Sequence, residues 1–305
     1  MSYHFTALGT SAAVPTKTRG CPSYYLQMDS ERILIDCGEG AQTQIIKHVS
    51  HGFKMNKVFI THAHPDHVLG LPGLIFSLNL NGRTKPLDVH GPETLHPWLL
   101  QQISFFEIDL NFEIRYNTHD FQKPQKLWTT HSLEFWSIPL DHTIPCCGFL
   151  AIKSEGVRKI KKSTIQSLNL SVSQIKQLKA GLDATGEDGV VYEATALTYK
   201  KPEEKILAFI SDSRPLDNNL ELLKEVHYIF HESTFLDADS HRAEFTGHST
   251  AKEAGQFAQH IQAKNLLLGH FSPRYPHPNL FISEASPYCS NVLAMQDGQR
   301  IDLKI

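Results

Sequence analysis

A dense cluster of metal-binding side chains constrains the fold of this chain more than any other feature. Three histidines and one aspartate occur within six residues, in the run His62-Ala63-His64-Pro65-Asp66-His67. The residues before it, Val58-Phe59-Ile60, are apolar and β-favouring, which is typical of a short buried strand. The cluster is therefore predicted to lie on the loop that leaves a strand end, where functional side chains are commonly displayed on a rigid scaffold.

The spacing within this cluster favours two metal ions over one. His62 and His64 lie two residues apart, so they project to the same side of an extended backbone. Pro65 holds the residue before it in an extended conformation, which preserves that arrangement. Asp66 and His67 then point into a neighbouring site. Two metals, each bound by part of the cluster, fit this pattern better than a single ion.

A site of this size needs further ligands, and three apolar strands run into suitable residues. Asp141-His142 follows residues 137–140, Asp212 follows 208–211 and His270 follows 266–269. A single histidine or aspartate at a strand end is more often capped or solvated than bound to a metal. The joint occurrence of all three with the upstream cluster favours a dinuclear site over a structural metal or a chance motif.

The composition is that of a globular protein. The chain has 305 residues, of which 41% are hydrophobic and 20% charged, enough for one large domain or two ordinary ones. Its formal net charge is −3, so a nucleic-acid partner would require a local basic patch. Five cysteines without C-x-x-C spacing fit the reduced thiols of the cytosol. Without a secretory leader or an apolar run of membrane length, we expect a cytoplasmic protein that does not enter membranes.

Short strands alternate with helices along most of the chain, which predicts a layered domain of sheets and helices. We expect helices at 41–48, 74–80 and 94–106, a hairpin of 23–28 with 32–35, and later strands at 206–211, 226–231 and 266–269. Gly38 and Gly40 suggest backbone packed closely against another segment, although a plain tight turn fits equally well. Residues from about 153 to 205 differ in composition from the rest of the chain, because large apolar residues become rare and basic residues cluster there. We expect this segment to be an excursion from one domain.

With its candidate ligands in this order, the sequence resembles the metallo-β-lactamase superfamily and, within it, the ribonuclease Z family. The similarity covers nearly the whole chain and includes Leu8–Ser11, Pro15–Arg19, Asp36–Gly40, Gly70–Leu74, Asp212–Arg214, His231–Phe235, Gly247–Thr250 and His270–Tyr275. It implies an α/β fold (α+β, four-layer), the metallo-β-lactamase αββα sandwich, formed by a single domain of residues 1–305 with an inserted protruding arm at about 153–205. The histidine motif alone does not identify the substrate, because thioester hydrolases, lactamases and nucleases share it.

The resemblance implies a zinc-dependent endoribonuclease that removes the 3′ trailer from precursor tRNA. A metal-activated water would attack a phosphodiester, leaving a 3′-hydroxyl on the tRNA. One zinc ion would be held by His62, His64 and His142 and the second by Asp66, His67 and His270, with Asp212 as a bridge and Mn²⁺ as a reasonable substitute metal. A general metal-dependent phosphodiesterase that acts on small esters or other nucleic acids is the alternative. The intact ligand set argues against a non-catalytic RNA-binding scaffold.

Residues outside the histidine cluster carry the assignment of substrate. By resemblance, His248 is the general acid and Glu232 holds its other ring nitrogen, while Asp66 accepts a proton from the attacking water. Without the resemblance, His248 would be interpreted as a capping contact at the start of a helix. Lys17 and Arg19 would contact RNA near the cut, although on residue type alone they are typical of a solvated loop.

The basic residues of the inserted segment are the candidates for binding the tRNA backbone, namely Arg158, Lys159, Lys161 and Lys162. In the family an arm at this position grips the tRNA, often across a homodimer, whereas a charged run is otherwise a solvated surface. The family's arm has a tip rich in glycine and proline, but this chain has Leu168–Ile175 there. Either the tip of the arm has diverged in this chain or the arm folds differently from the family pattern.

Overall fold

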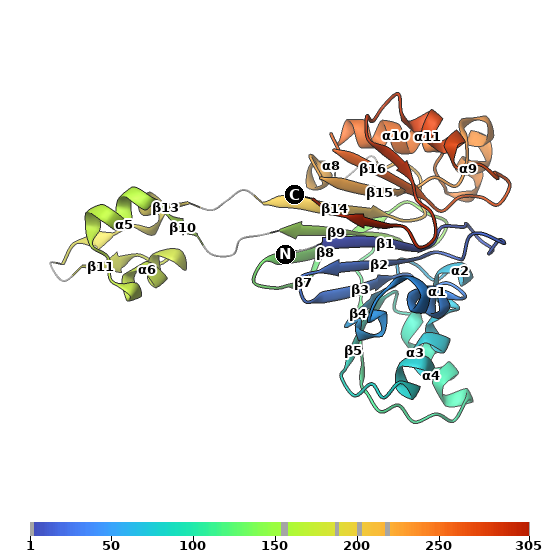
Figure 1. Ribbon diagram of the computed structural model, residues 1–305, viewed down its shortest axis with the longest axis horizontal. Coiled ribbons are helices and arrows are strands. Elements are labelled where there is room, and N and C mark those ends of the chain that lie inside the picture. Colours follow the sequence, from blue (N-terminus) through green and yellow to red (C-terminus); the bar gives the residue numbers. More distant parts are fainter. Residues whose placement is uncertain (1–2, 154–157, 187–188, 200–202, 217–219, 305) are drawn as a thin grey trace.

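Two seven-stranded sheets face each other in the computed structural model, which describes residues 3–304 except 154–157, 187–188, 200–202 and 217–219 (Figure 1). The strand order is β18-β1-β2-β3-β4-β5-β6 in the first sheet and β17-β16-β15-β14-β9-β8-β7 in the second. Helices cover the outer face of each sheet. The predicted αββα sandwich is confirmed.

The first sheet is built from the N-terminal part of the chain and its last strand. Its strands are β1 (Tyr3–Gly9), β2 (Ser23–Met28), β3 (Glu31–Ile35), β4 (Lys57–Phe59), β5 (Leu87–Gly91), β6 (Ile114–Thr118) and β18 (Arg300–Asp302). Strands β3 to β6 run parallel, and parallel neighbours require crossover connections. These crossovers contain α1 (Ala41–His48), η1 (Gly52–Lys54), α2 (Pro65–Val68), α3 (Leu71–Leu80) and α4 (Leu95–Phe105).

The second sheet has an antiparallel half and a parallel half. Its strands are β7 (Gln125–Thr129), β8 (Leu133–Leu140), β9 (Cys146–Lys153), β14 (Glu204–Ile210), β15 (Tyr228–Glu232), β16 (Asn265–Gly269) and β17 (Val292–Ala294). Strands β14 to β17 are parallel. The helices that follow them are α8 (Leu220–Leu223), η2 (Asp237–Asp239), α9 (Ser240–Thr246), α10 (Ala251–His260) and α11 (Asn279–Ala285). Thr250 caps α10 through a reciprocal pair of hydrogen bonds with Glu253.

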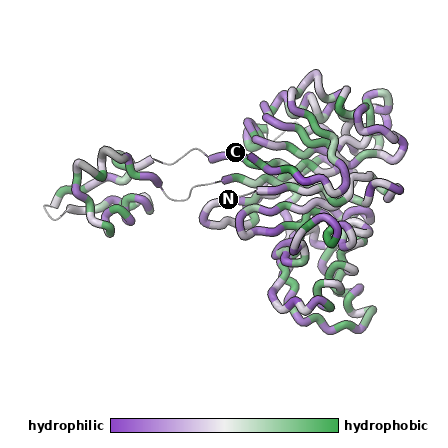
Figure 2. The backbone as a smooth tube through the Cα atoms, viewed as in Figure 1, coloured by the Kyte–Doolittle hydropathy of each residue, from purple (hydrophilic) through white to green (hydrophobic). Residues whose placement is uncertain are grey.

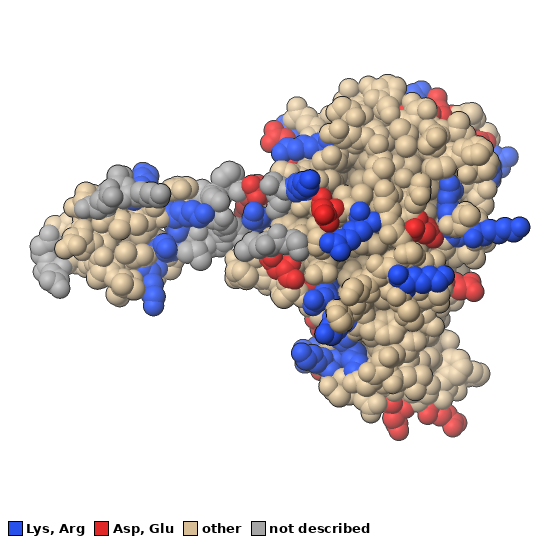
Figure 3. Space-filling model, in the orientation of Figure 1, with Lys and Arg blue, Asp and Glu red and all other residues tan. Residues whose placement is uncertain are grey.

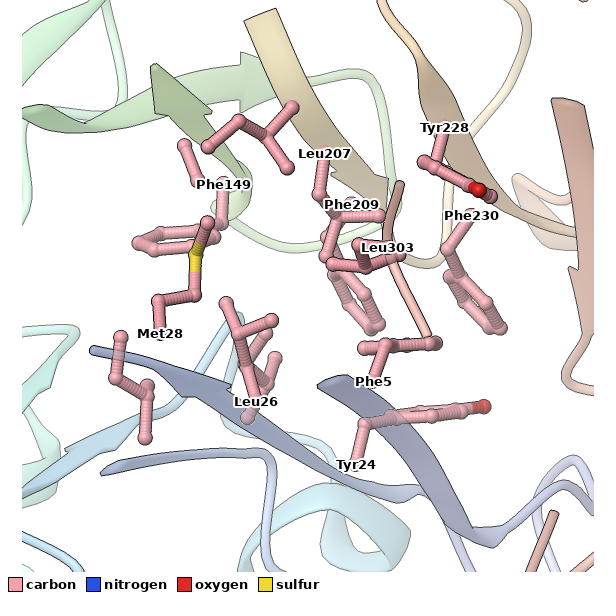
Figure 4. Close-up of a cluster of buried hydrophobic side chains, with 14 of the residues drawn as sticks. Phe5, Tyr24, Leu26, Met28, Phe149, Leu207, Phe209, Tyr228, Phe230 and Leu303 are labelled. Carbon is pink, nitrogen blue, oxygen red and sulfur yellow. The ribbon is translucent and has the colours of Figure 1, made fainter. Parts of the chain in front are cut away.

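Aromatic side chains fill the space between the two sheets (Figure 4). Phe5 and Tyr24 of the first sheet contact Phe230 of the second, and Phe230 stacks on Phe209 with ring centroids 4.5 Å apart. The intervening residues of β14 and β15 face α10 and α11 instead. These strands are buried on both faces, which explains their nearly continuous apolar sequences and the hydrophobic segments in the middle of Figure 2.

The segment between β9 and β14 forms a small unit that stands apart from the sandwich in Figure 1. It contains β10 (Lys159–Ile160), α5 (Lys162–Leu168), α6 (Val172–Lys179), β11 (Ala184–Thr185), β12 (Val191–Tyr192), α7 (Ala194–Leu197) and β13 (Thr198–Tyr199). A small cluster of its own is buried there, with Ile160 and Leu178 at its centre. Leu168–Ile175, where the sequence departs from the family pattern, forms the end of α5 and the capped start of α6. None of the described helices has the length and apolar character needed to cross a bilayer.

Candidate metal centre

The predicted metal ligands converge at one end of the sandwich, where strand ends of both sheets meet. The loop after β4 brings His62 and His64, and α2 brings Asp66 and His67. His142, Asp212 and His270 follow the ends of β8, β14 and β16. Carboxyl ends of parallel strands lie at the same edge of a sheet, and sites in α/β folds form at that edge. Seven side chains from different parts of the sequence thereby face a common space.

The first group comprises His62, His64, His142 and Asp212, whose potential ligand atoms all lie within 4.8 Å of one another. His64 Nδ1 is 3.0 Å from His62 Nε2 and 3.2 Å from His142 Nε2. His62 Nε2 is 3.6 Å from Asp212 Oδ2. His64 therefore faces the group with Nδ1, whereas the other two imidazoles face it with Nε2.

The second group comprises Asp66, His67 and His270. Asp66 Oδ2 lies 3.6 Å from His67 Nε2 and 3.7 Å from His270 Nε2. Asp212 also reaches this group, because its Oδ2 is 3.3 Å from His67 Nε2 and its Oδ1 is 3.3 Å from His270 Nε2. The carboxylate of Asp212 thus lies between the two groups, the position that a bridging ligand requires.

A hydrogen bond on the far nitrogen orients each imidazole that faces the groups with Nε2. Nδ1 of His67 lies 2.8 Å from Asp36 Oδ2, and Nδ1 of His270 lies 2.8 Å from Thr234 Oγ1. On the first group, Nδ1 of His62 lies 3.0 Å from Thr61 Oγ1, and Nδ1 of His142 lies 2.8 Å from the carbonyl oxygen of Gly247. Such contacts fix ring orientation and are typical of metal-binding histidines.

The protonation chemistry of the site suits cations. Burial lowers the pKa of His62, so its imidazole is held in the neutral form that binds metals. Burial also acts to lower the pKa of His67, but the adjacent Asp212 and Asp36 raise it well above its usual value. These carboxylates attract positive charge to the site.

Buried polar atoms in this space also lack partners. Among the described residues, His67 Nε2, Asp212 Oδ1 and His270 Nε2 are buried without a hydrogen-bond partner. A buried polar group left in this way is unfavourable unless something else binds it. Imidazole and carboxylate donors of this kind fit Zn²⁺, and a metal ion would bind all three atoms.

His248 lies beside the two groups and is oriented by a buried carboxylate. Its Nδ1 is 2.9 Å from Oε1 of Glu232, which is fully buried. Burial acts to lower the pKa of His248, but the charge and hydrogen bond of Glu232 raise it to about 9. Thr250, not His248, provides the side-chain cap of α10, so the capping interpretation of His248 is wrong.

The loop with Lys17 and Arg19 lies next to the second group of ligands. The backbone N–H of Ala13 donates a 2.8 Å hydrogen bond to Asp66 Oδ2. Arg19 is half-buried, with its guanidinium carbon 4.9 Å from the centre of the Phe271 ring. Lys17 is exposed and helps to line a pocket of about 370 Å³. Arg19 therefore packs against the segment after His270, whereas the side chain of Lys17 is exposed to solvent beside the pocket.

The arm that carries the basic residues stands apart from the sandwich in Figure 1, and Lys or Arg side chains are visible on it in Figure 3. Arg158 Nε donates to Thr198 Oγ1 at 2.5 Å and Lys161 Nζ donates to the carbonyl oxygen of Ala196 at 2.9 Å, both within the arm. Lys159 follows in β10, and the side chain of Lys162 lies outside the described residues. The described contacts of Arg158 and Lys161 are thus made within the arm and not with the predicted metal ligands.

Sequence reasoning missed several residues that support the ligands. Asp36 is the clearest, because it is buried against His67 and adopts a left-handed φ of 56°. A signal was present two residues later, since a Cβ on Gly38 would lie 2.3 Å from the carbonyl oxygen of Asp66. The close backbone approach suggested by that glycine is confirmed. Thr234 gave no such signal, because it contacts His270 only through the fold.

The relatives that match this chain over nearly its full length share one name, whereas a family model with another name matches its first half. The chain is 33% identical to "Ribonuclease Z" of Phocaeicola vulgatus over 297 residues, which is 97% of this chain and 96% of that protein. It is 31% identical to "Ribonuclease Z" of Parabacteroides distasonis over 301 residues, 99% of both chains. Residues 3–144 match the family model described as "Anti-Pycsar protein Apyc1". The crystal structure of human tRNase Z, short form, superposes with a TM-score of 0.72 and 26% identity, covering 99% of this chain and all of that one.

Proposed function

The chain belongs to the ribonuclease Z family, and from that membership we propose that it removes the 3′ trailer from precursor tRNA. It is an endoribonuclease that hydrolyses one phosphodiester and leaves a 3′-hydroxyl on the tRNA. The observation that carries the proposal is the juxtaposition of seven metal-ligating side chains with the His248–Glu232 pair. A phosphodiester bound at the ligands would have a proton donor beside it.

We propose two zinc ions per chain, held by the two groups of ligands and bridged by Asp212. The mixed imidazole and carboxylate donors support zinc, and Mn²⁺ is a reasonable substitute. When bound, such a pair of ions activates water as a nucleophile and stabilises charge on the attacking and leaving oxygens.

Asp66 is proposed to accept a proton from the attacking water. Burial acts to raise the pKa of Asp66, but His270 and His67 lower it below its usual range, so the carboxylate is ionised. Its Oδ2 is held by the N–H of Ala13. This hydrogen bond restricts the orientation of the carboxylate, which would take the proton from an oxygen within hydrogen-bond distance.

His248 is proposed to donate the proton that the leaving 3′ oxygen needs. Its Nδ1 is committed to Glu232, so Nε2 is the atom that faces substrate. Glu232 is itself immobilised, because Oε1 accepts from the N–H of Ser249 at 2.9 Å and Oε2 accepts from the N–H of Thr234 at 2.8 Å. The negative charge of Glu232 favours the protonated imidazole that a general acid must be at neutral pH.

Further parts of the proposal concern RNA binding. Lys17 and Arg19 would contact RNA near the cut, and Arg158, Lys159, Lys161 and Lys162 of the inserted arm would contact the tRNA backbone in a homodimer. The mildly acidic chain requires such local patches. We propose that the protein acts in the cytoplasm, where its five buried, unpaired cysteines stay reduced.

The deciding experiment is incubation with a trailer-bearing tRNA, followed by mapping of the cut and its end chemistry. We expect a single cut at the trailer junction and a 3′-hydroxyl on the tRNA. A higher kcat/KM for a small chromogenic phosphodiester than for precursor tRNA would instead support the general phosphodiesterase. Metal analysis of protein purified without chelators should give about two zinc ions per chain, and one or none contradicts the dinuclear proposal.

Two variants test the individual roles. His248→Ala should slow the cleavage of precursor tRNA while bound metal stays unchanged, and loss of metal would make His248 a ligand. Deletion of the arm should raise the KM for precursor tRNA far more than the KM for a small phosphodiester, because only the tRNA extends to the arm. Equal effects on both substrates argue against RNA binding by the arm.

A further inference from the structure

We propose that Arg214 is a positioning residue for the general acid, and this inference rests on the role of His248 proposed above. Arg214 follows the bridging Asp212 by two residues in the loop after β14. Its guanidinium does not contact the ligands. It holds the backbone of His248, so that the imidazole is presented to the leaving oxygen.

The contacts of Arg214 converge on the segment that carries His248. Nη1 donates to the carbonyl oxygen of His248 at 2.5 Å and to Glu253 Oε2 at 3.2 Å, and Nη2 donates to Glu253 Oε1 at 2.5 Å. This is a paired contact between guanidinium and carboxylate, a geometry that restricts both partners. Glu253 in turn accepts from the N–H of Thr250 at 2.8 Å.

Arg214 also connects this segment to the metal ligands. Its own N–H donates to the carbonyl oxygen of Asp141 at 2.8 Å, next to the ligand His142. His142 Nδ1 contacts the carbonyl oxygen of Gly247 at 2.8 Å. The backbone at Gly247 and His248 is therefore fixed from two sides, by a metal ligand and by the guanidinium.

Glu232 and Arg214 fix different parts of the acid. Glu232 orients the ring of His248 through Nδ1, whereas Arg214 fixes the main chain from which the ring extends. The side chains of Arg214 and Glu253 are 24% and 22% exposed, so this ion pair is largely shielded from solvent. Removing the guanidinium leaves the His248 carbonyl and the Glu253 carboxylate without their shared donor, and the loop can then relax.

The expected effect is a selective loss of rate. General acids contribute about 10²- to 10⁴-fold, and a misplacement of about 1 Å can reduce the rate about 10²-fold. Arg214→Ala should therefore lower kcat for precursor tRNA by about 10- to 100-fold while KM and metal content stay unchanged. The loss should be smaller than that of His248→Ala.

The test compares two leaving groups in the same protein. The tRNA 3′ oxygen leaves poorly unless it is protonated, whereas p-nitrophenolate leaves without a proton donor. Arg214→Ala should lower the rate on precursor tRNA but change hydrolysis of a p-nitrophenyl phosphodiester by less than about twofold. Arg115→Ala is the matched control, because Arg115 pairs with Glu113 at 2.8 Å on the exposed strand β6, and should change neither rate.

Two further measurements make the result decisive. In a double-mutant cycle on precursor tRNA, Arg214→Ala should add almost nothing once His248 is alanine, because both changes remove the same function. Arg214→Lys keeps the charge but not the paired geometry, so it should show a smaller loss with the same selectivity. If Arg214→Ala does not fold, the selectivity of Arg214→Lys between the two substrates tests the positioning role of Arg214.

Three outcomes overturn the inference. Equal losses on both substrates would show that Arg214 supports the whole site, and multiplicative effects in the cycle would show that it acts separately from His248. Both would leave the proposed function intact if the unaltered protein cuts precursor tRNA. Failure of the unaltered protein to cut precursor tRNA would overturn the proposed function, and this inference with it.

Discussion

Asp36→Asn tests whether the contacts behind the ligands determine metal affinity. Asp36 is fully buried, accepts a 2.8 Å hydrogen bond from the N–H of Thr61 and lies 2.8 Å from Nδ1 of His67. Asparagine has the same shape and tolerates the left-handed φ of 56° at this position. The substitution therefore removes charge without removing volume or straining the backbone.

The expected loss is confined to one ion. Outer contacts of this kind are worth about 10- to 100-fold in metal affinity, or about 1.4–2.8 kcal/mol. His67 belongs to the group with Asp66 and His270, so the ion bound there should be affected. The other proposed ion would be held in part by His62, which Asp36 reaches only through the hydroxyl of Thr61.

The assay is a zinc titration against a competing chelator, which resolves two dissociation constants. The weaker binding step of Asp36→Asn should be 10- to 100-fold weaker than in the unaltered protein, and the other within about threefold. Asp88→Asn is the control, since it removes a carboxylate 3.0 Å from Lys57 on a neighbouring strand, away from the ligands. Unchanged constants, or equal losses at both ions, would refute the reasoning.

Three other outcomes depend on burial. Gly38→Ala places a Cβ 2.3 Å from the carbonyl oxygen of Asp66, so metal analysis should find reduced zinc. Phe209→Ala leaves a cavity in the core between the sheets and should lower the free energy of unfolding by about 3–5 kcal/mol in a urea titration. Burial lowers the pKa of His119 to about 3 and that of His90 to about 4. Between those values and about pH 6.5 the two imidazoles bind protons only in the unfolded state, so the free energy of unfolding falls as the pH falls. His119→Gln should make the loss between pH 7 and pH 5, measured by urea unfolding, about 2 kcal/mol smaller.

Periodicity and turn residues predicted several helices and strands of the sandwich. The helix at 41–48 has the predicted bounds, and the helix predicted at 94–106 is α4. Helix α3 begins at Leu71 rather than 74, because proline is favoured in a first helical turn. Strand β7 was missed since it is a largely polar edge strand, and β9 because its pairing with β8 and β14 is long-range. Edge position and strand pairing are properties of the assembled sheet.

The residues of the site likewise include some that the sequence reveals and others that only the fold reveals. Metal-capable residues that end apolar strands could be recognised in the sequence, and the structure brings all seven together. Arg214 could not be assigned, because one of its partners is a main-chain carbonyl, that of His248, which carries no residue signature. The same holds for the carbonyl oxygen of Gly247 behind His142. The candidate ligands could be proposed from residue type, whereas the groups that orient them depend on backbone atoms placed by the fold.

The basic residues of the arm can still attract phosphate although they form hydrogen bonds within the arm, because a hydrogen bond to a neutral acceptor does not neutralise their charge. Arg158 donates to the hydroxyl of Thr198 and Lys161 to the carbonyl of Ala196, and both acceptors are neutral. These contacts restrict the side chains but leave their positive charge uncompensated by those partners. Phosphate binding releases counterions in proportion to the charges engaged. The salt dependence of precursor-tRNA binding, compared between the full chain and the arm deletion, therefore measures the contribution of this cluster better than side-chain exposure does.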